Sequence, residues 1–166
     1  MDDVALARLA TRVGRALARA GLRVVTAESC TAGWIAKVLT DTPGSSVWLD
    51  SGYVTYSNEA KVRALGVSRR TLARFGAVSK QTVREMARGG LRLSGVEVSI
   101  AVSGIAGPDG GTPAKPVGTV WFCVARRHGR SVTASTMHAR LGGDRDAVRR
   151  KSVARALRLI LRQLAR

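Results

Sequence analysis

Short apolar runs alternate with longer segments of helical periodicity along the whole 166-residue chain. Apolar runs of this length are typical of buried strands, whereas the longer segments repeat their apolar residues every three or four positions, as one face of a helix does. A chain that alternates in this way builds a sheet with helices on both of its faces. The pattern predicts one domain over residues 1–166, an α/β/α sandwich with a mixed, mostly parallel sheet and an antiparallel hairpin.

Cap and turn residues set the expected boundaries of these elements. Asn58, Ser68 and Ser79 are the expected N-caps of three helices, and the acidic residues Asp144 and Asp146 suit the positive end of the terminal helix. Glycine and proline end the helices or turn one strand into the next. The predicted helices begin near residues 3, 34, 58, 68, 79 and 144, and the predicted strands cover 22–27, 47–56, 97–102, 117–125 and 131–139.

The formal net charge of +17 would suit a nucleic-acid-binding protein, but the distribution of the charge argues against that class. Arginines are scattered from Arg8 to Arg166, and few aromatic residues are available to stack on bases. In the terminal helix, arginines recur every three or four residues and form one solvated stripe opposite the apolar face. We expect weak, salt-sensitive binding of polyanions and no specific nucleic-acid partner.

The two cysteines, Cys30 and Cys123, form no CxxC pair, so neither a disulfide framework nor a zinc site is expected. The two histidines have no neighbouring carboxylate cluster, and no metal held by protein ligands alone is predicted. No apolar run reaches the roughly 18 to 20 residues that span a bilayer. Asp2 and Asp3 stand where a signal peptide would carry basic residues. The expected location is the cytoplasm, without a membrane partner.

Ser29 lies where the first predicted strand gives way to a helix. The first turn of a helix has unpaired N–H groups and a positive dipole end, which stabilise an oxyanion or a bound anion, so Ser29 is a candidate nucleophile. The alternative is that Ser29 only caps the helix. The glycine-rich loop at 103–111 also follows a strand, and ligands of such sheets bind beyond the carboxyl ends of strands. Both segments are therefore expected to line one pocket.

Six sequence blocks occur along the chain in an order that resembles the CinA C-terminal domain family. The blocks are TAESCTAG at 26–33, GYVTYSNEAK at 52–61, GAVS at 76–79, SGIAGPDGG at 103–111, KPVGTV at 115–120 and GDR at 143–145. The resemblance runs from the first helix to the last. It implies hydrolysis of the carboxamide of nicotinamide mononucleotide to nicotinate mononucleotide and ammonia, with no cofactor and in a homo-oligomer. The fused N-terminal unit of larger family members is not expected here.

Ser29, Tyr56 and Lys61 match the catalytic positions that the resemblance implies. Ser29 is then the nucleophile, Lys61 is the general base once desolvation lowers its pKa, and Tyr56 relays a proton or orients a hydroxyl. Without the family, Lys61 and Tyr56 would be taken for surface residues. Cys30 is the rival nucleophile, because a helix start also lowers the pKa of a thiol. No histidine is placed to pair with it, and Cys30→Ala is expected to stay active.

The residues expected to bind substrate come from the same blocks. The glycine-rich loop offers backbone N–H groups to a phosphate, although it also fits a plain turn between strands. The candidates are Glu28, Cys30, Thr31, Ser46, Ser103, Gly104, Gly107, Gly111, Lys115, Thr119 and Arg145, of which Lys115 and Arg145 would bring positive charge to phosphate.

Two other kinds of protein stay open as alternatives. A catalytically silent member of the family would bind a nucleotide without releasing ammonia. A polyanion-binding protein would lose its main interaction steeply with salt. The choice among mononucleotide, riboside and free base as substrate is also open.

Overall fold

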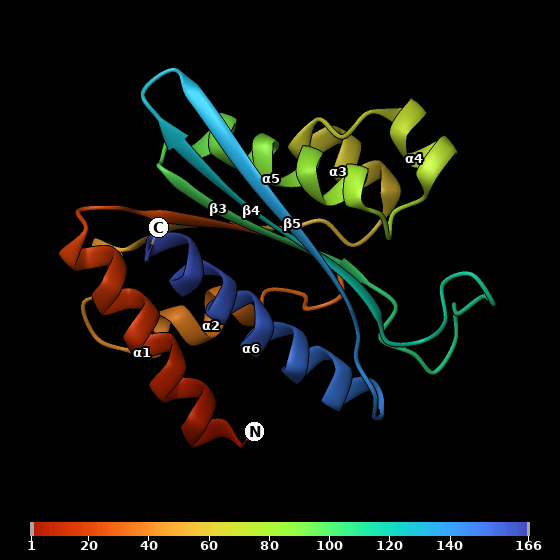
Figure 1. Cartoon of the computed structure of the whole chain (residues 1–166), viewed down its shortest axis with the longest axis horizontal. Coiled ribbons are helices and arrows are strands. Elements are labelled where there is room, and N and C mark those ends of the chain that lie inside the picture. The colour runs from red at the N-terminus through yellow and green to blue at the C-terminus, as the bar shows by residue number, and fades with distance from the viewer. Residues whose placement is uncertain (1, 166) are drawn as a thin grey trace.

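The computed structural model describes residues 2–165 and contains one five-stranded sheet with helices on both faces (Figure 1). The strands lie in the order β2-β1-β3-β4-β5. They are β1 (Val24–Glu28), β2 (Leu49–Val54), β3 (Val98–Gly104), β4 (Thr119–His128) and β5 (Ser131–Arg140). The helices are α1 (Asp3–Arg19), α2 (Trp34–Thr40), α3 (Asn58–Leu65), α4 (Arg69–Phe75), α5 (Lys80–Ser94) and α6 (Arg145–Leu164), with a 3-10 turn η1 (Ser45–Val47) before β2.

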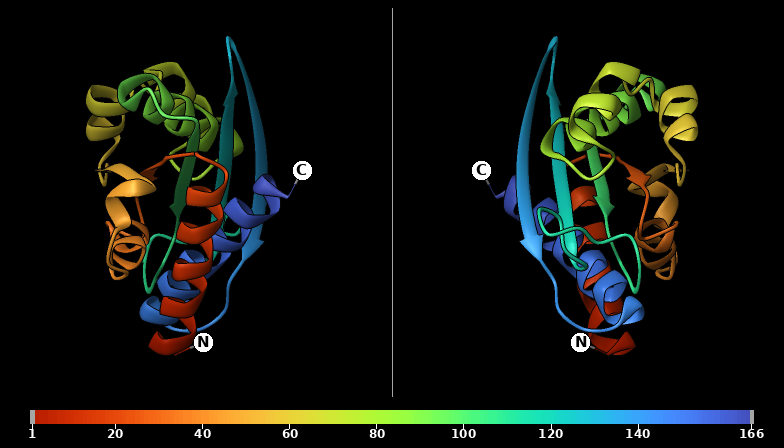
Figure 2. Two further views of the ribbon diagram at one scale, coloured as in Figure 1. Left: turned by 90° about the vertical axis from the view of Figure 1, so that its left-hand side faces the viewer. Right: turned by 90° about the vertical axis from the view of Figure 1, so that its right-hand side faces the viewer.

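The pairing of the strands confirms the predicted mixed sheet. Strand β1 pairs in parallel with β2 and with β3, whereas β3–β4 and β4–β5 pair antiparallel. Only β4 therefore runs against the other four strands. The long β4–β5 hairpin extends beyond the other strands at one end of the sheet (Figures 1 and 2).

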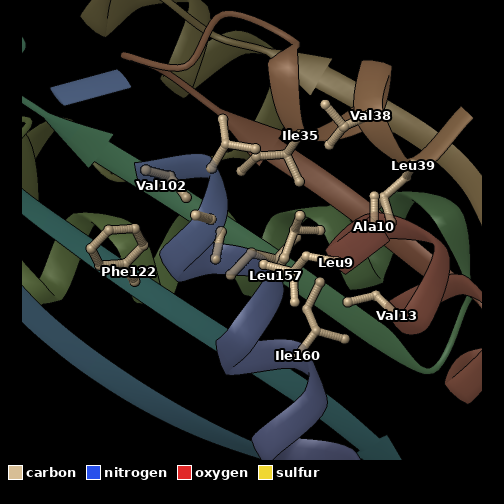
Figure 3. Packing of buried hydrophobic residues seen from close by; sticks show 14 of the residues in the cluster. Leu9, Ala10, Val13, Ile35, Val38, Leu39, Val102, Phe122, Leu157 and Ile160 are labelled. Carbon is tan, nitrogen blue, oxygen red and sulfur yellow. The ribbon is translucent and has the colours of Figure 1, made fainter. Parts of the chain in front are cut away.

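Two hydrophobic layers hold the helices to the sheet. One face of the sheet packs on α1, α2 and α6, where Leu9, Ile35 and Leu157 meet Val102 and Phe122 (Figure 3). The other face packs on α3, α4 and α5 and presents small residues from the central strands. Because side chains alternate across a strand, the same strands supply both layers. In Figure 1, α3, α4 and α5 lie above the sheet, and α1, α2 and α6 lie below it.

Helix α5 comes very close to α3 at Gly89. A Cβ atom built on Gly89 would lie 2.1 Å from the carbonyl oxygen of Leu65, so only glycine fits there. The Arg92 guanidinium donates a hydrogen bond to the same carbonyl oxygen over 3.1 Å. Helix α3, which carries Lys61, therefore rests directly on the backbone of α5.

Some predicted boundaries were wrong. Ser57, and not Asn58, is the N-cap of α3, because its hydroxyl accepts the N–H of Ala60. The predicted strand at 47–56 is shorter, since η1 occupies its first residue. The antiparallel strand predicted at 117–125 is shifted to Thr119–His128. Among residues 2–165, no helix has both the length and the apolar character that a bilayer span requires.

Candidate active site

A pocket of about 180 Å³ lies beyond the carboxyl ends of β1 and β3. As predicted, the Ser29 turn and the start of the glycine-rich loop line it together. Its wall consists of Ser29, Cys30, Tyr56, Lys61, Ala77, Val78, Ser103, Gly104, Ala106 and Arg145. The segment at 77–78 and Ala106 are lining residues that the sequence analysis missed, because small apolar side chains carry no chemical signal of their own.

Lys61 is almost completely buried, with 1% of its surface exposed, and its amine reaches Ser29. Lys61 Nζ donates hydrogen bonds to Ser29 Oγ over 3.0 Å and to the carbonyl oxygens of Thr55 over 2.8 Å and Tyr56 over 3.2 Å. Burial disfavours the charged amine and lowers the pKa of Lys61 from 10.5 to about 8. No carboxylate contacts this amine among the described residues.

Three oxygen atoms surround Nζ, and a charged ammonium satisfies all three with its three N–H donors. A neutral lysine has two N–H donors and one lone pair. When the amine is neutral, the two carbonyl oxygens take its two donors, and the lone pair is then free to accept the proton of the Ser29 hydroxyl. The arrangement can therefore accept the serine proton without breaking its other two hydrogen bonds.

Ser29 occupies a tight turn and does not cap a helix. Its N–H donates to the carbonyl oxygen of Val102, which fixes the residue against β3, and its carbonyl oxygen accepts the N–H of Ala32. Helix α2 begins five residues later, and its N-cap is Gly33. The capping alternative was therefore wrong, and so was the expectation that the first turn of α2 offers its N–H groups to Ser29.

Glu28 uses those N–H groups instead. Its side chain is fully buried and accepts hydrogen bonds from the N–H groups of Ile35 and Ala36 and from the Thr31 hydroxyl. A carboxylate at a helix N-terminus compensates both the unpaired donors and the positive end of the dipole. Glu28 and Thr31 thus fix the turn that carries Ser29 and do not face the pocket.

Arg145, at the start of α6, is part of the pocket wall. Its guanidinium donates to the Tyr56 hydroxyl over 2.9 Å and to the carbonyl oxygen of Gly107 over 2.7 Å. Gly107 has a positive φ of 83°, and a Cβ atom there would lie 2.6 Å from Val117. The Tyr56 hydroxyl therefore contacts Arg145, while its carbonyl oxygen positions the Lys61 amine.

Arg149 also supports the Ser29 turn, and the sequence analysis missed it. Its guanidinium donates to the carbonyl oxygens of Cys30 and Thr31 and lies 5.3 Å from the ring of Trp34. Arg149 follows Arg145 by four residues, so both lie on the same face of α6. That spacing was the only signal in the sequence for its position.

Cys30 lines the pocket, but its thiol does not ionise readily to the thiolate. Its side chain is 5% exposed, and burial raises the pKa of the thiol to about 12. No histidine belongs to the pocket wall as the structure describes it. The physical setting favours Ser29 over Cys30 as nucleophile.

Of the remaining predicted binding residues, Ser103 and Gly104 belong to the pocket wall, whereas the others do not: Ser46, Gly107, Gly111, Lys115 and Thr119. Ser103 lines the pocket, but its hydroxyl donates to the carbonyl oxygen of Ala77. Lys115 donates to the carbonyl oxygen of Phe75, so these two residues brace the segment that forms one wall. Thr119 is buried and donates to the carbonyl oxygen of Pro116, whereas Ser46 and Gly111 are exposed and away from the wall.

The fold and the buried Ser29–Lys61 pair define a small α/β protein with a pocket suited to serine–lysine chemistry. The chain belongs to the CinA C-terminal domain family, which matches residues 6–164. It is 51% identical over 163 residues to the nicotinamide-nucleotide amidohydrolase PncC of Escherichia coli, covering 98% of this chain and 97% of that protein. The PncC of Pseudomonas putida is 50% identical over 149 residues, covering 90% of this chain and 91% of the relative.

Solved structures agree with this assignment. A CinA superfamily protein from Klebsiella pneumoniae superposes with a TM-score of 0.91 at 42% identity, covering 96% of this chain and 98% of that one. The resemblance deduced from the six sequence blocks is thereby confirmed.

Proposed function

We propose that this protein hydrolyses the carboxamide of nicotinamide mononucleotide to nicotinate mononucleotide and ammonia. The single observation that carries the proposal is the buried amine of Lys61 within 3.0 Å of Ser29 Oγ in a pocket, in a chain half identical to nicotinamide-nucleotide amidohydrolases. An amide is a poor electrophile with a poor leaving group. Its hydrolysis needs a nucleophile, a base that later protonates the departing amine, and donors for an oxyanion.

The reaction divides into two halves at this site. Ser29 Oγ attacks the carboxamide carbon while Lys61 Nζ takes the hydroxyl proton. The resulting ammonium passes a proton to the departing nitrogen, and ammonia leaves an ester on Ser29. Water then attacks that ester with Lys61 as base, which releases the carboxylate and restores the serine.

The backbone of the Ser29 turn supplies the donors that stabilise the oxyanion. The backbone hydrogen bonds of this turn use the N–H groups of Ser29, Ala32 and Trp34. The N–H groups of Cys30 and Thr31 are therefore the candidate donors. Arg149 holds the peptide unit of Thr31 N–H through the Cys30 carbonyl oxygen, and the Ala32 N–H holds that of Cys30 N–H through the Ser29 carbonyl oxygen. Donors that are fixed before the reaction stabilise developing charge without having to reorganise.

The size of the pocket suggests how the substrate lies. Sites that enclose a whole drug-sized ligand measure about 300 to 1000 Å³. The volume of about 180 Å³ suits the nicotinamide end, with the carboxamide toward Ser29. The phosphate then stays at the mouth, near the Arg145 guanidinium and the N–H groups of the glycine-rich loop. Tyr56 orients Arg145 in this arrangement.

The assembly and location of the protein are part of the proposal. Val47, Val54 and Tyr56 are 59%, 52% and 60% exposed around β2, which is an edge strand. Exposed apolar residues gathered at a sheet edge are typical of an interface. We infer a homo-oligomer in the cytoplasm, without a metal or organic cofactor.

The three candidate substrates test the proposal directly. Ammonia release should be fastest with nicotinamide mononucleotide, slower with the riboside and slowest with free nicotinamide, because only the mononucleotide brings a phosphate to Arg145. We expect Arg145→Gln to lower kcat/KM for the mononucleotide by about tenfold and to change the riboside rate little. Equal rates on all three would mean that phosphate is not recognised, and binding without ammonia would indicate a silent module.

The pH dependence of turnover should report Lys61. Only its neutral form can take the serine proton, and its pKa is lowered to about 8 by burial. We therefore expect kcat/KM to rise about tenfold per pH unit below pH 8 and to level off above it. If kcat/KM levels off only near pH 10.5, the ordinary pKa of a lysine, the amine is not desolvated in the working enzyme.

A further inference from the structure

A second cavity of about 520 Å³ lies between the C-terminal half of α5 and the β4–β5 hairpin. It is lined by Arg88, Leu91, Arg92, Arg127, Arg130 and Val132. Four of these six residues are arginines. The cavity is larger than the catalytic pocket and falls within the range of small-ligand sites.

This arginine groove is separate from the catalytic pocket. Arg126 pairs with Val98 at the first residue of β3, whereas Gly104 of the catalytic pocket is the last residue of that strand. The two cavities therefore lie at opposite ends of the sheet. Figure 1 shows the turn between β4 and β5 at one end of the sheet and the loop between β3 and β4 at the other.

The positive charge of the groove is not compensated by the protein. Within residues 2–165, no carboxylate oxygen lies within 4.0 Å of any of the four guanidinium groups. The nearest acidic residues along the chain are engaged elsewhere: the Glu97 carboxylate accepts the N–H of Arg23, and the Glu85 carboxylate accepts the N–H of Ser68. Like charges gathered without a counter-charge repel one another. A bound anion would remove that repulsion.

Two of the arginines are held in place while keeping free donors. The Arg127 guanidinium donates to the carbonyl oxygen of Leu91 over 2.7 Å, and its Nε is buried without a hydrogen-bond partner among the described residues. Arg92 donates one hydrogen bond, to the carbonyl oxygen of Leu65. Each guanidinium has five N–H donors and makes one of these hydrogen bonds, so terminal N–H groups of both side chains remain for a ligand, whereas the buried Nε of Arg127 does not face the solvent. Arg88 and Arg130 are exposed at the rim.

We infer that the arginine groove binds a small polyphosphate, either free or as part of a nucleotide. One phosphate accepts the donors of one or two guanidinium groups, so four of them suit a chain of two or three phosphates. Leu91 and Val132 supply an apolar floor beside the charges. None of the lining residues is aromatic, which argues against stacked bases of a single-stranded nucleic acid.

Binding of tripolyphosphate and of adenosine triphosphate, measured by titration calorimetry at physiological ionic strength, tests this inference. The double variant Arg88→Gln, Arg130→Gln removes two rim charges and leaves the buried contacts intact. Its matched control, Arg8→Gln, Arg15→Gln, makes the same change in net charge on exposed positions of α1, on the opposite face of the sheet. Both variants should keep the amidase rate of the unmodified protein, because none of these residues lines the catalytic pocket.

We expect one polyphosphate per chain, with Kd raised at least about tenfold in the rim variant and less than about twofold in the control. Tighter binding of adenosine triphosphate than of tripolyphosphate would identify a nucleotide site, and equal binding would identify a site for the phosphates alone. Amide hydrogen exchange should slow at 88–92 and 127–132. Absence of saturable binding, equal weakening in both variants, or displacement by an oligonucleotide at equal phosphate concentration would overturn the inference.

Discussion

Replacing Ser29 by alanine should lower the rate of ammonia release by at least about 1000-fold, because Ser29 carries the hydroxyl of the pocket wall that contacts the Lys61 amine. Ser29 is 8% exposed and its hydroxyl accepts a hydrogen bond from Lys61, so alanine removes one small polar group from a formed pocket. The fold should persist, since the N–H of residue 29 would still donate to Val102. Rates from single-turnover ammonia assays, with mononucleotide affinity measured separately, provide the test.

Cys30→Ala is the matched control for this experiment. It removes the neighbouring side chain from the same turn and the same pocket wall, and the buried thiol with its raised pKa supplies no nucleophile. We expect turnover within about threefold of the unmodified protein, since the change only shortens a buried side chain. A collapse of turnover in Cys30→Ala together with survival in Ser29→Ala would exchange the roles of the two residues.

Replacing Lys61 by methionine should lower kcat by about 100- to 10,000-fold, the range that a positioned general base supplies. Methionine fills much of the same buried space but has neither a lone pair nor N–H donors. Substrate affinity should change far less than kcat, because the amine acts on the serine proton and not on the ground-state substrate. The measurement is kcat and KM at several pH values. Any residual activity should no longer show the rise with pH that levels off near pH 8.

The buried setting of Lys61 makes a folding control necessary. Methionine leaves the carbonyl oxygens of Thr55 and Tyr56 without their donor, which costs about 1 to 3 kcal/mol for each group left unpaired. Removing a desolvated amine offsets part of that loss. Circular dichroism and mononucleotide binding should therefore accompany the kinetics. Wild-type kcat in a folded Lys61→Met protein would eliminate lysine as the base.

The overall architecture was predictable because it depends on periodicity. Apolar spacing gives the order of strands and helices and the antiparallel hairpin. The position of the carboxyl ends of parallel strands brings the Ser29 turn and the glycine-rich loop together. Ser57 shows where such prediction stops, since Ser57 and Asn58 are both good caps and only the local geometry chooses between them.

The fine geometry of the site was less predictable, because burial and hydrogen bonding are properties of the folded chain. Glu28 and Thr31 belong to the same sequence block as Ser29, yet their side chains turn inward to hold the start of α2. Lys61 lies on a short helix with four polar and four apolar residues, and the packing of α3 on α5, closest at Leu65 and Gly89, is not visible in the sequence. Arg149 acts through main-chain carbonyl groups, a role that residue type alone does not indicate.

Helix α3 packs against the backbone of α5 at Gly89, and this contact affects how the protein can diversify. The amine is located by main-chain contact, whereas Ala77, Val78 and Ala106 shape the cavity from connecting segments. Enlarging or trimming those three side chains should alter which amides enter while leaving the proton-transfer apparatus undisturbed. Substrate range and chemical competence can thus evolve on separate parts of the chain.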